Sequence, residues 1–140
     1  MDVAKEPIRE RLVALRNGLL KLHKELLDSE RTIYERDVAR INSPGQFLRL
    51  LLEDPYFEWL RELSQLVVLI DETIEWEEPA TFADADRLIA QARVLVAPSD
   101  QGSGFARSYY EAMQRDPAVV MAHSDMLKVF AALEPNRRPR

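Results

Sequence analysis

The sequence predicts an all-α protein: an antiparallel, up-down-up-down four-helix bundle whose second and fourth arms are kinked at proline. Three observations support this prediction. Apolar residues recur at alternating steps of four and three along most of the chain, which keeps one face of a helix against a partner. Helix-capping residues followed by proline mark several of the expected boundaries. No long stretch alternates with a period of two, so no sheet is expected.

The first arm is expected to begin near Pro7 and to continue to about Ile41. Its apolar positions follow steps of four and three and then one step of seven: Ile8, Leu12, Leu15, Leu19, Leu22, Leu26 and Ile33. This heptad stripe predicts one continuous seam facing neighbouring helices. Gly18 is the weak position of the arm, at roughly 1 kcal/mol relative to alanine.

The second arm is expected to have two parts. Ser43-Pro44-Gly45-Gln46 has the form of a capping box ahead of a short helix. Asp54-Pro55 gives a second start, with Asp54 as a cap and not as a catalytic acid. The stripe that follows consists of Tyr56, Leu60, Leu63, Val67, Ile70 and Ile74, and Pro79 ends the arm.

The third and fourth arms show the same signals. Thr81, with Asp84 three residues later, begins the third arm, which is the shortest at about 16 residues. Its stripe consists of Phe82, Ala85, Ile89, Ala92 and Val96. The fourth arm begins after the loop 98–104, is interrupted at Asp116-Pro117, where Asp116 is expected to be a cap and not a catalytic acid, and ends near Leu133. Its later stripe consists of Val119, His123, Met126, Phe130 and Leu133.

A chain of 140 residues suits a single domain with its own hydrophobic core. We therefore expect one helical-bundle domain over residues 1–134 and a disordered basic tail over residues 135–140, which has no apolar residue.

Composition excludes several classes of function. The absence of cysteine excludes a disulfide framework, a thiolate nucleophile and a Cys-ligated metal. The net charge of −5 argues against a nucleic-acid-binding protein, whose affinity comes mainly from neutralising phosphates. The longest aliphatic run, Leu66 to Ile70, is too short to cross a bilayer, so no membrane partner is expected. The N-terminus lacks the apolar core of a signal peptide, which predicts a cytoplasmic location.

No catalytic or metal-binding group is predicted. The chain has two histidines, and neither His23 nor His123 has a second ligand within one helical turn. No serine lies in a Gly-x-Ser-x-Gly elbow. The glycine-rich segment 101–105 lacks the lysine of a phosphate-binding loop, so a flexible linker is the favoured interpretation. No cofactor is expected.

A polar stripe lies beside the apolar seam of the first arm, where Arg16, His23, Glu30 and Asp37 repeat every seven residues. The favoured interpretation is a flanking charged position paired to a neighbouring helix. The alternative is a partly buried polar line that binds a small ligand or moves a proton. The candidate ligand-binding residues are His23, Glu30, Trp59 and His123. A hydrogen bond across the bundle is the favoured interpretation for His123, which lies on an apolar stripe.

A second candidate surface is apolar. The short third arm should leave the far ends of the first two arms uncovered, and large apolar groups there are unlikely to face water in a stable monomer. The candidate interface residues are Tyr34, Val38, Phe47, Leu48, Leu51, Leu52 and Trp59. The competing explanation is that Phe105 to Met113 covers them as core.

Charge is also distributed unevenly. Acidic residues gather at the end of the second arm, where they oppose the helix dipole: Asp71, Glu72, Glu75, Glu77 and Glu78. We expect them to pair with the basic start of the first arm, which carries Lys5, Arg9, Arg11 and Arg16. A docking face for a basic protein or a cation is the alternative.

Several short segments together resemble a family of short, all-helical bacterial proteins without an assigned activity. They are Leu22-His23-Lys24 through Glu30, Tyr34-Glu35, Ser43-Pro44, Asp54-Pro55, Phe57, and Trp59-Leu60-Arg61 to Ile70-Asp71-Glu72. The resemblance implies a bacterial, cytoplasmic protein and no particular chemistry.

The leading hypothesis for function is a non-enzymatic helical-bundle protein that acts through self-association as a homodimer or through a protein partner. The alternative is a small-ligand-binding or sensor bundle with a polar pocket near His23, Glu30 and His123. An enzyme has the least support from the sequence.

Overall fold

The computed structural model describes residues 5–134, which form six α-helices, one 3₁₀ helix and no strand. The elements are α1 (Lys5–Asp37), α2 (Pro44–Glu53), η1 (Pro55–Leu60), α3 (Arg61–Ile74), α4 (Phe82–Leu95), α5 (Gly104–Arg115) and α6 (Pro117–Ala132). The predicted all-α class is confirmed for these residues. The four-arm antiparallel arrangement is not confirmed, because six α-helices are present. The predicted tail, 135–140, lies outside the described residues.

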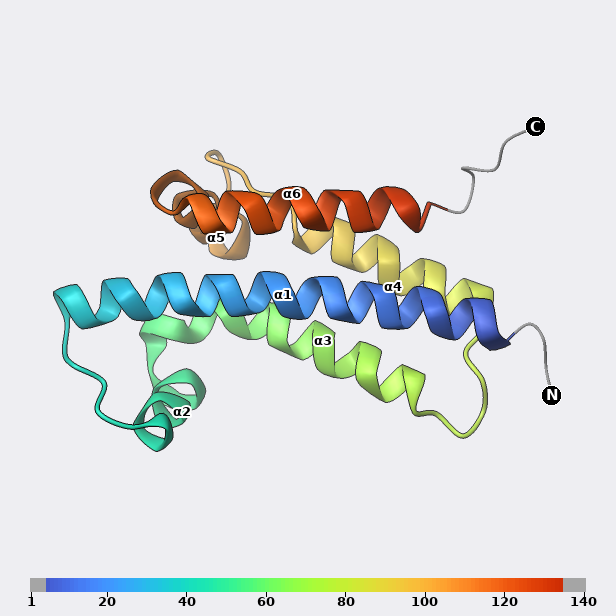
Figure 1. The fold of residues 1–140 in the computed structure, drawn as a ribbon, viewed down its shortest axis with the longest axis horizontal. Coiled ribbons are helices and arrows are strands. Elements are labelled where there is room, and N and C mark those ends of the chain that lie inside the picture. The colour runs from blue at the N-terminus through green and yellow to red at the C-terminus, as the bar shows by residue number, and fades with distance from the viewer. Residues whose placement is uncertain (1–4, 135–140) are drawn as a thin grey trace.

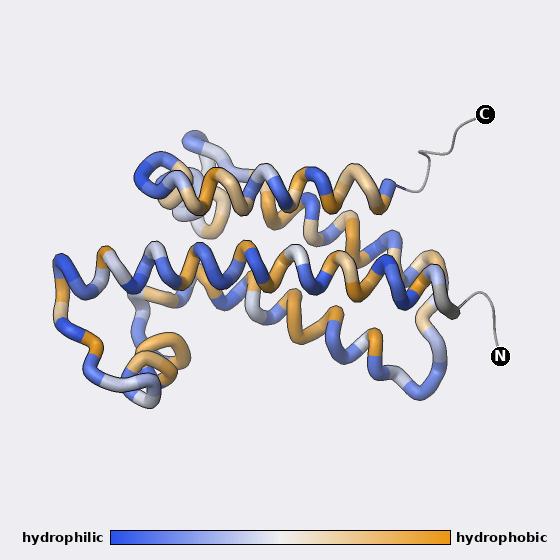
Figure 2. Tube along the Cα trace, in the orientation of Figure 1, coloured by the Kyte–Doolittle hydropathy of each residue, from blue (hydrophilic) through white to orange (hydrophobic). Residues whose placement is uncertain are grey.

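The 33-residue helix α1 is the longest element, at about 50 Å. Figure 1 shows α3 along one side of α1 and α6 along the other, and α1 makes its most extensive contacts with these two helices. In Figure 2, hydrophobic and hydrophilic residues alternate along α1, as expected of a helix with one buried face. α1 therefore organises the packing of the other helices.

The predicted stripe of α1 is buried for most of its length: Ile8, Leu12, Leu15, Leu19, Leu22 and Leu26 are at most 6% exposed. Ile33, predicted as the last member, is only partly buried, and Tyr34 is the buried residue at that level. The physical reason is that a straight α-helix drifts by about 20° per heptad relative to an exact seven-residue repeat. After several heptads, the residue one position later faces the core.

Both predicted aspartate caps are confirmed. The Asp54 carboxylate accepts a hydrogen bond from the Tyr56 N–H at 2.8 Å, and the Asp116 carboxylate accepts one from the Ala118 N–H at 2.9 Å. Both aspartates have extended backbone, as expected for a residue before proline. The chain therefore leaves the helix at each of these positions, which gives separate helices where the sequence predicted kinked ones.

The other predicted caps are also present. Thr81 and Asp84 form a complete capping box at the start of α4, with distances of 3.0 and 2.8 Å. Ser43 Oγ accepts a hydrogen bond from the Gln46 N–H at 3.0 Å. The Gln46 side chain does not return this bond to Ser43, since it accepts from the Asn42 N–H at 2.7 Å. These caps satisfy backbone N–H groups that have no partner within the helices.

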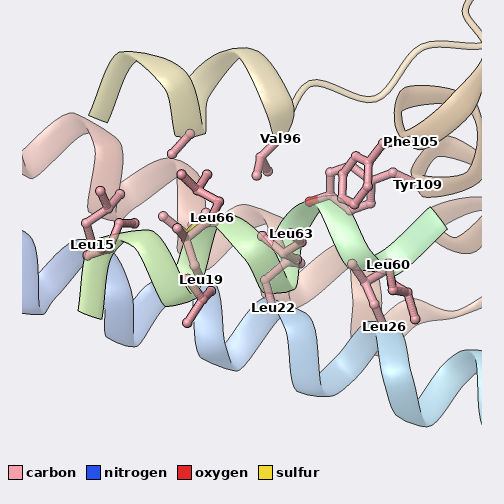
Figure 3. Packing of buried hydrophobic residues seen from close by; sticks show 14 of the residues in the cluster. Leu15, Leu19, Leu22, Leu26, Leu60, Leu63, Leu66, Val96, Phe105 and Tyr109 are labelled. Carbon is pink, nitrogen blue, oxygen red and sulfur yellow. The ribbon is translucent and has the colours of Figure 1, made fainter. Parts of the chain in front are cut away.

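The hydrophobic core lies where α1 meets α3, α4, α5 and α6. Figure 3 shows the leucines of α1 and α3 pointing toward one another, with Phe105 and Tyr109 of α5 beside them. Gly18 has a packing role: a Cβ atom at this position would lie only 3.0 Å from the Met126 sulfur of α6. The missing side chain thus allows α1 and α6 to approach closely, which explains a glycine within a long helix.

The predicted pairing of the acidic end of α3 with the basic start of α1 is present in part. Arg16 forms an ion pair with Asp71 at 2.8 Å. Arg9 donates a hydrogen bond to the carbonyl oxygen of Ile74 at 3.5 Å, near the end of α3. Arg11 instead forms its ion pair with α4. The other acidic residues at the end of α3 are exposed.

Candidate functional site

The first two members of the polar stripe of α1, Arg16 and His23, face α3, whereas the last member, Asp37, is exposed and pairs with its neighbour Arg36. Besides the Arg16–Asp71 ion pair, His23 Nε2 lies 2.7 Å from Ser64 Oγ, within hydrogen-bond distance. Partner numbers fall along α3 as residue numbers rise along α1, so these two helices run in opposite directions. Burial lowers the pKa of His23, which favours a neutral ring at pH 7. His23 therefore has the interhelical partner that the favoured interpretation expects of this stripe.

Glu30, seven residues after His23, is the most buried charged group described, at 7% exposed. Its Oε1 accepts a hydrogen bond from Trp59 Nε1 at 3.0 Å, and its Oε2 accepts one from the Arg115 guanidinium at 2.5 Å. Burial raises the pKa of Glu30, while the Arg115 charge and the two hydrogen bonds oppose that rise. One carboxylate thus connects α1, η1 and the end of α5.

His123 lies on α6, with its Nδ1 atom 2.6 Å from the hydroxyl of Tyr109. Tyr109 is fully buried, and this burial raises its pKa well above the usual range, so the hydroxyl keeps its proton. Burial also lowers the pKa of His123. In a neutral ring, Nδ1 either accepts from the hydroxyl or donates to it, according to the tautomer. The predicted hydrogen bond between helices is present.

A row of rings connects Glu30 to His123. The ring centroids of Trp59 and Phe105 are 5.2 Å apart, those of Phe105 and Tyr109 are 5.6 Å apart, and those of Tyr109 and His123 are 5.4 Å apart. Three of the four candidate ligand-binding residues therefore belong to one contact series. His23 is the exception, because its hydrogen-bond partner lies on α3.

Nothing within residues 7–134, whose side chains the structure describes, identifies a ligand for this series. Every buried side-chain nitrogen and oxygen atom in that range has a hydrogen-bond partner. Five grooves and cavities lie elsewhere on the described helices, and other residues line them. In the same range, no three His, Asp or Glu residues are close enough to hold a metal ion. The polar pocket near His23, Glu30 and His123 stays a prediction.

The seven candidate interface residues differ in how far they are exposed, and Tyr34 and Trp59 are the two that the rest of the chain covers by aromatic contacts. Tyr34 is buried and contacts the rings of Tyr56 and Phe57, so it belongs to the core. Trp59 is half-buried against Phe105 of α5, which is the covering that the competing explanation expected.

Four of the other five candidate residues lie on α2, and the fifth, Val38, directly follows the end of α1. Phe47 and Leu51 are half-buried, whereas Leu48, Leu52 and Val38 are 57%, 64% and 58% exposed. α2 packs mainly on η1 and has no buried residue. Figure 1 shows α2 projecting at one end of the molecule, and Figure 2 shows it as a mostly hydrophobic segment. We call its outward surface, formed by Leu48, Arg49 and Leu52, the α2 face.

A second open surface was not predicted from the sequence. A groove of about 640 Å³ lies between α3 and α4, and its lining includes Glu62, Leu66, Leu69, Arg87, Val94 and Leu95. Val94 is 80% exposed. Leu69 and Val94 lie outside the apolar stripes of their helices, and such off-stripe residues were the signal available in the sequence. We call this surface the α3–α4 groove.

Comparison with known proteins supplies no relative from which a site could be transferred. No family model, curated protein or solved structure matches this chain. The resemblance to short bacterial proteins therefore remains an expectation. The described helices also include none that is long and apolar enough to cross a membrane. Two open apolar surfaces, the α2 face and the α3–α4 groove, and the buried series that begins at Glu30 are the features that bear on function.

Proposed function

We propose that this protein is a non-enzymatic helical-bundle protein that acts by self-association, and that the α2 face is the contact surface. The observation that carries the proposal is the exposure of Leu48 and Leu52 on a helix without any buried residue. Apolar groups gain free energy when a partner removes them from water, at about 25 cal/mol per Å². An exposed apolar patch of this kind marks an interaction site.

The α2 face is held in a fixed orientation. A ten-residue helix is marginal on its own in water, so its own chain must support α2. Phe47 packs on Phe57 with ring centroids 5.8 Å apart, and Arg31 lies over the Phe47 ring. Arg61 donates a hydrogen bond to the carbonyl oxygen of Leu51 at 3.2 Å. A surface ordered before binding loses less conformational entropy on association, which favours affinity.

The same proposal extends to the architecture of the bundle. We take α2, η1 and α3 as one interrupted arm, and α5 and α6 as another, of an antiparallel up-down-up-down four-arm bundle. In such a bundle, α2 is the part of the second arm that the other arms do not cover. A bacterial, cytoplasmic setting is also proposed.

The test measures molecular mass against concentration by sedimentation velocity and light scattering. The wild-type protein is expected to form a reversible dimer. Leu48→Glu with Leu52→Glu should give a folded monomer, because both side chains are exposed and the fold does not depend on them. A matched control, Val120→Glu with Met121→Glu on α6, changes two exposed apolar residues elsewhere and should still dimerise.

Two results would overturn this proposal. A wild-type protein that stays monomeric across the accessible concentrations would exclude self-association. An α2 double variant that unfolds, while the α6 control remains folded, would show that Leu48 and Leu52 belong to the core. Circular dichroism and thermal melting of the two double variants separate loss of association from loss of folding.

A second candidate function is small-ligand binding at the buried series. The observation that favours it is a carboxylate, Glu30, buried among Trp59, Arg115 and aromatic rings, with its pKa raised by burial. A thermal-shift screen with metal ions and small metabolites tests it. A hit should raise the melting temperature of the wild type and leave that of Glu30→Gln unchanged. A hit that stabilises both proteins equally would place its site elsewhere.

A further inference from the structure

The α3–α4 groove is open because the two helices that form it are each packed more extensively on α1 than on each other. Its floor includes Leu66, which is 3% exposed, and its walls carry Leu69 and Val94, which are 38% and 80% exposed. Charged residues, including Glu62 and Arg87, stand among the lining residues. An apolar floor beneath a polar rim is the usual form of a groove that accepts an amphipathic helix.

The groove and α2 agree in length. α2 has ten residues and is therefore about 15 Å long. Along α3, the lining extends from Glu62 to Leu69, and this two-turn stretch is about 12 Å long. The two exposed leucines of α2 are four residues apart, which puts them about 6 Å apart along one side of the helix. This i, i+4 spacing is the anchor pattern of a helix bound in a groove.

The charges on the two surfaces are complementary. The α2 face carries Arg49, and the α3 side of the groove carries Glu62. Neither residue takes part in an ion pair with any side chain of residues 7–134. On the α4 side, Arg87 already pairs with Asp84 at 2.6 Å. Arg49 is therefore a cation available for the exposed carboxylate of Glu62.

The groove of the same copy does not suit α2. The packing of Phe47 on Phe57 and the hydrogen bond from Arg61 to Leu51 hold the outer leucines away from the chain's own core. A symmetric pairing of two α2 faces is the alternative, and the trapping experiment below distinguishes it from docking in the groove.

We propose that the α2 face of one copy docks in the α3–α4 groove of a second copy, with Leu48 and Leu52 against Leu69 and Val94, and Arg49 beside Glu62. This inference rests on the self-association proposed above and names the surface that the α2 face meets. Two copies related by a twofold axis can form two such contacts, which gives a closed dimer.

The test uses disulfide trapping, for which the absence of native cysteine provides a clean background. Leu48→Cys and Val94→Cys are made in separate chains, mixed and oxidised gently. The expected product is a disulfide-linked dimer containing one chain of each variant. Val120→Cys, exposed on α6, replaces Val94→Cys in a control mixture and should give at least about tenfold less of the mixed dimer.

A second measurement uses the charges. Arg49→Glu should weaken dimerisation, because it places two carboxylates together, and Glu62→Arg added to it should restore the association. Leu69→Glu with Val94→Glu should weaken dimerisation roughly tenfold or more, since burying an unpaired charge is costly. All these positions are exposed, and thermal melting checks that each variant is folded.

The outcomes separate this inference from the proposed function. Suppose that Leu48→Cys links only to itself, and that Leu69→Glu with Val94→Glu still dimerises. Self-association through α2 would then stand, and docking in the groove would be wrong. A monomeric wild type that gives no trapped dimer would overturn both. Both proposals would be supported if the groove double variant and the α2 double variant each lose dimerisation, and if Glu62→Arg restores dimerisation to the Arg49→Glu chain.

Discussion

Replacing Arg115 with methionine tests the buried carboxylate at the centre of the Glu30 series. The variant keeps much of the side-chain volume and removes the cation 2.5 Å from Glu30 Oε2. Glu30 would then keep one strong partner, the Trp59 N–H, in a site where its side chain is only 9% exposed. Removing one member of a fully buried ion pair costs about 3–5 kcal/mol. Because the Arg115 side chain is 31% exposed and water reaches it, we expect a loss of about 2 kcal/mol at pH 7.

The loss should depend on pH in a defined direction. Burial already raises the pKa of Glu30 above its ordinary value of 4.5, and removing Arg115 takes away the largest opposing influence. A carboxyl group with a raised folded-state pKa contributes stability below its unfolded pKa and loses that contribution as the pH rises through the folded pKa. The difference in stability between wild type and Arg115→Met should therefore be smaller near pH 4.5 than near pH 8.

Urea unfolding at the two pH values measures this difference directly, and titrating groups elsewhere cancel in the comparison. The double variant Arg115→Met with Glu30→Gln should recover much of the lost stability at pH 8, because no charge is then left buried. A loss that is equal at both pH values, or that Glu30→Gln does not relieve, would show that Glu30 and Arg115 are not coupled as a buried pair.

Three further predictions concern stability, and urea unfolding measures each of them. Asp54→Ala removes the cap of η1 and should cost about 1 kcal/mol, whereas an unchanged stability would contradict its capping role. Gly18→Ala should destabilise by about 1–3 kcal/mol, because the Met126 sulfur must move; in a Met126→Ala background, where the contact with Val129 at 3.3 Å remains, the same change should cost less. Burial lowers the pKa of His123, so its contribution should be full above pH 6.5 and decrease as the pH falls below that value. His123→Asn should remove part of that acid sensitivity.

The helical class and the helix starts could be predicted from the sequence because they depend on neighbouring residues. Asp54, Asp116 and Thr81 each cap a backbone N–H two or three residues away, so their role is readable without a fold. Whether proline kinks a helix or ends it depends on how the following segment packs. That packing is not local, which is why four kinked arms were expected where separate helices are present.

The candidate site likewise combines residues that the sequence pattern selects with a residue that only the fold brings to them. The heptad stripe selected Glu30, Trp59 was a candidate in the same predicted site, and the structure joins them by a hydrogen bond. Arg115 was missed because it is 85 positions away from Glu30 and only the packing of α5 brings it there. The exposed side of α2 was likewise unpredictable in detail. Phe47 and Leu48 are adjacent in the sequence, and the packing of α2 on η1 determines which of them is covered.

The hydrogen-bonded pairs between α1 and the segment 59–71 have a consequence for how these helices find their alignment. Apolar residues repeated every seven positions would still meet apolar residues if α3 slid along α1 by two turns, a shift of about 10.5 Å. After such a slide, Arg16 would face Ser64, and Glu30 would lose Trp59. Each step along the seam has a chemically different pair, so only one alignment satisfies all of them. The polar stripe thus supplies the positional information that a repeating apolar seam lacks, and it selects one native alignment among several of similar hydrophobic burial.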